Sequence, residues 1–121
     1  MTTRRSRIRK PQPVTWDTVR QLALELPAAE EGTSYGTPAI KVGKKLMIRL
    51  REDGEAFVLA CDFDERELLM EEQPEIFYIT DHYLKYPWVL VRLATVRADQ
   101  LPDLLQRAWR RVAPKRMGTG L

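Results

Sequence analysis

Three short apolar runs separated by two tight-turn signals occupy residues 37–61, and they limit the fold more than any other part of the sequence. In the middle run, apolar and polar side chains alternate, which is the period of a strand with one buried face. Gly43 and the pair Asp53-Gly54 are typical of tight turns. We therefore expect strands at 37–42, 44–51 and 56–61, joined as antiparallel hairpins. One side of the middle strand would carry Leu46, Ile48 and Leu50, and the other Lys45, Met47, Arg49 and Arg51.

Helical spacing of apolar residues predicts a helix near each end of the chain. The first runs from about residue 17 to residue 26, after a Thr15 N-cap. The last begins at an Asp99 N-cap and ends at Pro114. Each helix has a single apolar stripe, so we expect both to lie on one face of a sheet and to leave the other face partly open. The stripes contain Val19, Leu22, Ala23 and Leu26, and Leu101, Leu104, Leu105, Ala108 and Val112.

A further short helix is predicted at residues 62–73, with Asp64 as its cap and with Leu68 and Leu69 facing inward. The remaining segments are expected as strands at 75–80 and 88–96 and as a loop at 28–36. Short connections between strands favour antiparallel pairing. The predicted class is therefore α+β, with an antiparallel sheet of about five strands and the two terminal helices packed on one face.

The composition fits one globular domain, because 44% of the 121 residues are hydrophobic and 31% are charged. We expect a flexible basic arm at residues 1–13, a single domain at 14–117 and a tail at 118–121. No run approaches the roughly 18 apolar residues that a membrane helix needs, and no apolar signal-peptide stretch follows the basic N-terminus. The single Cys61 excludes an internal disulfide and a cysteine-cluster zinc site. These features lead us to expect a cytoplasmic protein without membrane contact.

Charge is segregated along the chain. Residues 41–51 hold five bases and no acid, whereas residues 52–75 hold ten acids and one base. Arginine contacts phosphate through two parallel hydrogen bonds, and aromatic rings stack on exposed bases. An open sheet face that presents arginines together with aromatic rings therefore predicts contact with DNA. The residues expected to make this contact are Lys41, Lys44, Lys45, Arg49, Arg51, Lys85, Trp88, Arg92, Arg110, Lys115 and Arg116.

Other interpretations of the same residues stay open. The arginines can simply solubilise the sheet face, with Trp88 half-buried under a loop. Alternatively, a small molecule or a protein can bind in a pocket near residues 82–88, formed by His82, Tyr83, Tyr86 and Trp109. The sequence contains none of the common catalytic or phosphate-loop motifs, and His82 is its only histidine. We therefore expect neither enzyme activity, nor a cofactor, nor a resident metal ion.

Five segments, taken in order, resemble the landmarks of the MmcQ/YjbR-like bacterial proteins. They are "LELPAAEE", "GTPAIKVGKKLMIRL", "CDFDERELL", "DHYLKYPWVLVRL" and "AWRRVAPKR". The resemblance covers residues 14–117 and implies a frataxin/CyaY-like α+β fold with DNA binding of a proposed double-wing type. It implies no established enzyme activity and no cofactor. The positions that match are Gly36, Pro38, Lys41, Lys44, His82, Tyr83, Lys85, Trp88 and Trp109.

The likeness to frataxin also raises an iron-binding hypothesis. The first helix offers only Asp17 and Glu25 as acidic residues. It therefore lacks the acidic ridge that iron binding would need.

Overall fold

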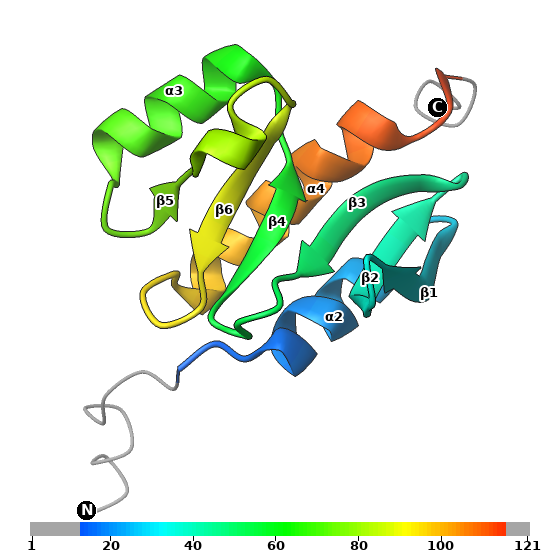
Figure 1. Ribbon diagram of the computed structural model, residues 1–121. Coiled ribbons are helices and arrows are strands. Elements are labelled where there is room, and N and C mark those ends of the chain that lie inside the picture. Colours follow the sequence, from blue (N-terminus) through cyan, green and yellow to red (C-terminus); the bar gives the residue numbers. More distant parts are fainter. Residues whose placement is uncertain (1–12, 116–121) are drawn as a thin grey trace, which may run out of the picture.

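The computed structural model describes residues 13–115, which form an open, six-stranded antiparallel sheet with helices packed against it (Figure 1). The order across the sheet is β1-β2-β3-β4-β6-β5. Consecutive strands from β1 to β4 pair as hairpins, because only short turns connect them. The strands are β1 (Ala29–Ser34), β2 (Thr37–Val42), β3 (Lys45–Leu50), β4 (Ala56–Ala60), β5 (Phe77–Tyr78) and β6 (Trp88–Arg92). Most of the predicted arm, the predicted tail and Arg116 lie outside the described residues.

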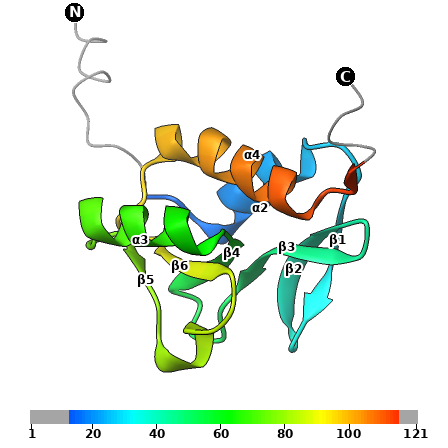
Figure 2. The same cartoon turned by 90° about the horizontal axis from the view of Figure 1, so that it is seen from above.

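Two helices, α2 (Trp16–Leu24) and α4 (Leu101–Val112), lie side by side on one face of the sheet (Figure 2). A third helix, α3 (Phe63–Glu72), packs beside β5 and β6. The predicted class, α+β with the terminal helices on one face, is confirmed. Within residues 13–115, no helix is long and apolar enough to cross a membrane.

The main core fills the space between these two helices and the sheet. Val19 of α2 and Leu105 of α4 are buried there against Ile48 of β3 and Val89 of β6. Burying one such aliphatic side chain stabilises the fold by about 1.5–3 kcal/mol. The apolar stripes therefore hold both helices on the same face, and the opposite face is left for other side chains.

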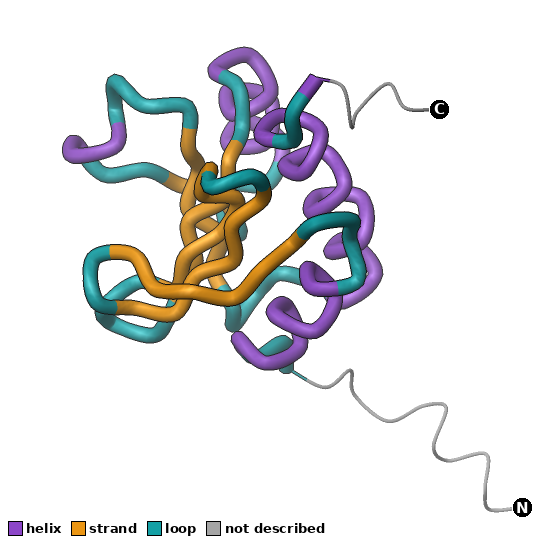
Figure 3. Tube along the Cα trace, turned by 90° about the vertical axis from the view of Figure 1, so that its right-hand side faces the viewer, coloured by secondary structure: helices purple, strands orange, loops and turns teal. Residues whose placement is uncertain are grey.

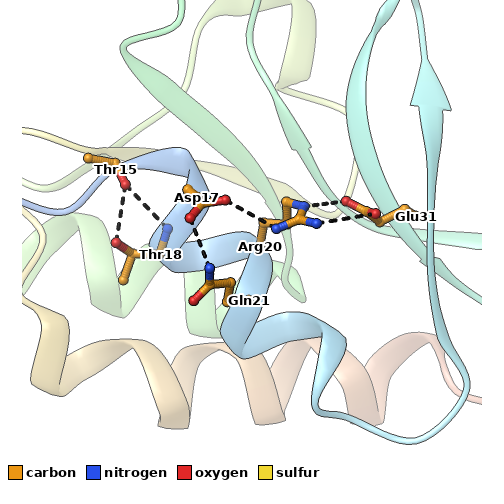
Figure 4. A network of polar contacts seen from close by, with 6 residues as sticks. All are labelled: Thr15, Asp17, Thr18, Arg20, Gln21 and Glu31. Carbon is orange, nitrogen blue, oxygen red and sulfur yellow. Dashed lines mark hydrogen bonds and ion pairs between the residues drawn. The ribbon is translucent and has the colours of Figure 1, made fainter.

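The expected loop at residues 28–36 is wrong, because most of it forms the edge strand β1. Its side chains are mainly exposed, so no alternation of apolar and polar residues marks it. Backbone pairing with β2 along its whole length and a turn with positive φ at Tyr35 and Gly36 specify the strand instead. Arg20 of α2 also forms an ion pair with Glu31, which joins the helix to this edge (Figure 4). The sheet consequently has six strands rather than about five.

The helix caps agree with the prediction only in part. Thr15 caps α2, and its Oγ1 accepts a hydrogen bond of 3.3 Å from the Thr18 amide (Figure 4). Helix α3 begins two residues earlier than an Asp64 cap predicts, because Asp62 accepts a hydrogen bond of 2.8 Å from the Glu65 amide. Helix α4 follows a 3₁₀ turn, η3 (Ala98–Gln100), so the expected Asp99 cap is also wrong.

The last two strands are shorter than predicted. Strand β6 ends at Arg92 because its carbonyl accepts a hydrogen bond of 3.0 Å from the Val96 amide, which closes a turn. Strand β5 has only two residues, and the chain then leaves the sheet into the 3₁₀ helix η2 (Asp81–Tyr83). We call residues 79–87 the η2 segment. It projects from the sheet on the side opposite α2 and α4 (Figure 3).

A bulge interrupts the alternation of β3. Ile40 pairs with Ile48, but the next residue, Lys41, pairs with Leu46, so Met47 is an extra residue on β3. Met47 and Ile48 are both buried in the main core. The expectation that Met47 shares a side with Arg49 is therefore wrong.

Candidate functional site

The open face of the sheet carries a pocket of about 640 Å³, which we call the open-face pocket. Its floor is formed by residues of β2, β3, β4 and β6, and its walls are the turn between β1 and β2 and the η2 segment. Both walls project away from the helices (Figure 2). The lining residues are Ser34, Tyr35, Lys41, Lys44, Leu46, Arg49, Arg51, Glu52, Val58, Thr80, His82, Tyr83, Tyr86 and Trp88.

Arg49 lies in the floor of this pocket and is only 5% exposed. Its Nη2 donates a hydrogen bond of 2.8 Å to the Tyr83 hydroxyl, and its Nη1 donates one of 3.1 Å to Thr37 Oγ1. Nη1 also lies 3.5 Å from a carboxylate oxygen of Glu52. The guanidinium thus ties β3 to the η2 segment and gives the floor of the pocket a recessed positive charge.

Arg51, two residues further along, adds a second cation to the floor. Its Nη1 donates a hydrogen bond of 3.4 Å to the Tyr78 hydroxyl and lies 3.9 Å from Asp53. Burial lowers the pKa of this guanidinium, but Tyr78 and Asp53 outweigh that effect and hold the pKa above its ordinary value. Its Nε is buried and has no hydrogen-bond partner in residues 13–115. Arg51 therefore keeps an unused donor beside the pocket.

Arg92 lies on the same face but does not line the pocket. Its guanidinium is stacked 4.1 Å from the centre of the Tyr78 ring, and its Nη1 donates a hydrogen bond of 3.1 Å to the Pro74 carbonyl. Arg51 and Arg92 thus share Tyr78, one at its hydroxyl and one at its ring face. These contacts hold β5 against β6 and leave Arg92 little freedom to reach a partner.

The lysines of the β2–β3 hairpin are the more accessible cations. Lys41 and Lys44 line the pocket, and the Gly43-Lys44 turn, with positive φ at both residues, directs the chain back into β3. Within residues 13–115, neither lysine forms an ion pair. Lys85 is exposed on the η2 segment but does not line the pocket.

A second concavity, which we call the side hollow, adjoins the open-face pocket. It has a volume of about 410 Å³ and is lined by Lys45, Leu46, Ala60, Pro87, Trp88, Arg111 and Val112. Leu46 and Trp88 line both concavities, so the two adjoin at these side chains. The expectation that Lys45 shares a side with Arg49 is wrong, because the bulge at Met47 turns Lys45 toward α4.

Three other predicted site residues lie elsewhere. Trp109, expected in the pocket, is buried in the core, where its Nε1 donates a hydrogen bond of 2.8 Å to the Pro27 carbonyl. Arg110 is exposed on α4 and lines neither concavity. Lys115 is exposed beyond the end of α4.

The η2 segment is held in place by Arg66, which the sequence analysis counted only as one base among acids. Arg66 is 6% exposed and donates hydrogen bonds to four main-chain carbonyls of the loop that leads into β6. Their lengths are 3.2 Å to Tyr83, 3.0 Å to Leu84, 2.8 Å to Tyr86 and 3.1 Å to Trp88. Leu68, predicted to face inward, is exposed instead. The helical spacing indicates that Arg66, rather than Leu68, faces inward. Arg66 precedes the partly buried Leu69 and Met70 by three and four residues, which places all three side chains on one face of the helix.

Cys61 is not a nucleophile in this arrangement. Burial raises the pKa of its thiol to about 12, and the carboxylates of Glu65 and Asp62 act in the same direction. The thiol is therefore protonated at neutral pH. Among residues 13–115, no three His, Cys, Asp or Glu side chains are grouped so that they could hold a metal ion.

Comparisons with known proteins match most of the chain. A family model described as YjbR matches residues 24–111. The uncharacterized proteins Rv2570 of Mycobacterium tuberculosis and Mb2600 of Mycobacterium bovis are each 30% identical over 121 residues, which is 85% of this chain and 92% of the relative. The crystal structure of Deinococcus radiodurans protein DR2400, which has the family-model domain DUF419, is 28% identical with a TM-score of 0.72 and 89% coverage of both chains. The residues matched by the family model include every strand and both walls of the open-face pocket.

Proposed function

The chain belongs to the YjbR family, and from this premise we propose that it is a non-enzymatic protein that binds nucleic acid along the open-face pocket and the side hollow. The observation that carries the proposal is that these two concavities adjoin at Leu46 and Trp88. It brings Lys41 and Lys44 into one run of surface with Lys45 and Arg111. A positively charged groove with aromatic side chains is the usual means of following a nucleic acid backbone.

The phosphate contacts are assigned to exposed cations rather than to the buried arginines. Lys44, Lys45 and Arg111 are exposed and Lys41 is partly exposed, so all four can reach a phosphate. Arg49 and Arg92 are already hydrogen bonded to groups of the protein itself, and Arg49 is recessed. Their role in this proposal is to shape the surface and to make its potential positive. A nucleic acid partner also agrees with the cytoplasmic location expected from the sequence.

The proposal predicts binding that weakens steeply as salt rises. Four phosphate contacts to a single strand would release enough counterions to weaken the affinity about 50-fold between 50 mM and 200 mM salt. Fluorescence anisotropy with a labelled 20-nucleotide DNA strand and with the corresponding duplex would measure this. Absence of binding to both probes at 50 mM salt, or an affinity that is equal at the two concentrations, would contradict the proposal.

A second candidate function is the binding of a small molecule in the open-face pocket. The volume of about 640 Å³ falls in the range of small-molecule sites, and Lys41, Lys44 and Thr80 line it with polar groups that a ligand can use. This function predicts a ligand-induced rise in melting temperature that persists at high salt. The salt dependence therefore distinguishes it from the first candidate.

A further inference from the structure

We infer that the open-face pocket receives one unstacked base of a single-stranded nucleic acid, an inference that rests on the proposed function. The shape of the site is the first reason. The pocket is a hollow between two projecting walls, and its deepest cation, Arg49, is only 5% exposed. The phosphates of a duplex lie on its outer surface and would meet the rims of the walls. A base that is turned out of a single strand can enter between them.

Two exposed tyrosines on opposite walls are the second reason. Tyr35, in the turn between β1 and β2, is 83% exposed, and Tyr86, in the η2 segment, is 53% exposed. Both line the pocket. Large exposed aromatic side chains that gather at a concavity mark binding surfaces, and tyrosine rings stack on bases irrespective of their sequence.

The conformation of Tyr35 strengthens this argument. Its φ is +53°, a region that favours glycine, asparagine or aspartate over an aromatic residue. The core gains nothing from its ring, whose contact is with the Arg49 guanidinium 5.2 Å below. A strained, exposed tyrosine above a recessed arginine is well placed to cover a planar ligand, because the cation also favours aromatic rings stacked near it.

The opposite wall is rigid in a way that suits stacking. Arg66 holds the main chain on both sides of Tyr86, at Tyr83 and at Trp88. His82 packs edge-on against Tyr83 with 4.9 Å between the ring centres. Side chains that are ordered before binding lose less entropy when a ligand arrives. Between the walls, the hydroxyl of Thr80, which lines the pocket, can bond the edge of a base.

The test uses oligonucleotides that differ only in their bases. Tyr35→Ala and Tyr86→Ala are each expected to weaken binding of a single DNA strand about 10-fold without changing its salt slope. Leu84→Ala is the matched control, because Leu84 is equally exposed on the η2 segment but does not line the pocket. It should bind like the unchanged protein. A strand with abasic units keeps all its phosphates, and its weaker binding should no longer respond to the tyrosine variants.

The outcomes separate this inference from the proposed function. Duplex binding as tight as single-strand binding, together with tyrosine variants that bind normally, would overturn the inference and leave the phosphate contacts intact. An equal affinity for the abasic strand and the normal strand would overturn it as well. Failure of every oligonucleotide to bind would overturn the proposed function itself. Melting curves of the variants are expected to be unchanged, because both tyrosines lie outside the core.

Discussion

Arg66→Met is expected to lower the free energy of unfolding by about 4 kcal/mol, because each buried carbonyl that loses its donor costs about 1–3 kcal/mol and water can replace only some of the four bonds. For a domain of this size, such a loss lowers the melting temperature by about 15 °C. Methionine fills similar space but donates no hydrogen bond. Denaturant titration followed by circular dichroism would measure the change.

Arg107→Met is the matched control for this substitution. Arg107 is half-exposed on α4 and forms ion pairs with Glu65 and Asp103 at 2.9 and 3.1 Å. Exposed ion pairs contribute about 0–1 kcal/mol, so the control should lose little stability. Arg66→Lys should recover part of the loss, because three of the four hydrogen bonds come from Nη1 alone and an ammonium group has three donors. A loss below about 1 kcal/mol for Arg66→Met would contradict the role given to Arg66.

Removal of the three lysines of the β2–β3 hairpin is expected to weaken binding to single-stranded DNA about 100-fold at 100 mM salt, because counterion release contributes roughly a factor of five for each phosphate contact there. The variant Lys41→Gln/Lys44→Gln/Lys45→Gln should also have a salt slope that is smaller by about two. Anisotropy titrations at several salt concentrations would give both quantities. All three side chains lie at the edge of the fold, so its stability should change little.

A variant with the same change in net charge, Arg97→Gln/Arg107→Gln/Arg110→Gln, tests whether position matters. None of these arginines lines the open-face pocket or the side hollow. This triple variant should keep most of the affinity for single-stranded DNA, because it loses only the long-range part of the electrostatic attraction. Equal losses in the two triple variants would mean that binding depends on net charge alone, and the proposed surface would then be wrong.

The parts of the fold that follow from burial were predictable from the sequence. The stripes of α2 and α4 repeat apolar residues at the helical period of 3.6 that one buried face imposes. Strand β4 is a short run that is apolar throughout, as expected of an interior strand, and β3 alternates except at its bulge. Strand β1 was not predictable in this way, because it is an exposed edge whose position depends on pairing with β2. The residues of β1 themselves show no pattern that identifies β2 as the strand with which they pair.

The candidate site was predictable only where the period of two holds. Alternation placed Arg49 and Arg51 on the open face, and both line the pocket. It failed at Lys45, because a bulge one residue long reverses the faces. Tyr35 was not predicted as a site residue, because residues 28–36 were expected to form a loop. The role of Arg66 was not predictable, because its hydrogen bonds go to main-chain carbonyls, which every residue type has.

The central claim, that nucleic acid lies on the open face with a base in the pocket, is tested most directly by mapping the contact. Amide chemical-shift changes on titration with a short DNA strand would locate it residue by residue in the folded protein. We predict changes concentrated at Tyr35, Lys41, Lys44 and Trp88, with α3 unaffected. Changes concentrated on α3 or on the exposed side of α2, with the pocket residues unmoved, would contradict the account.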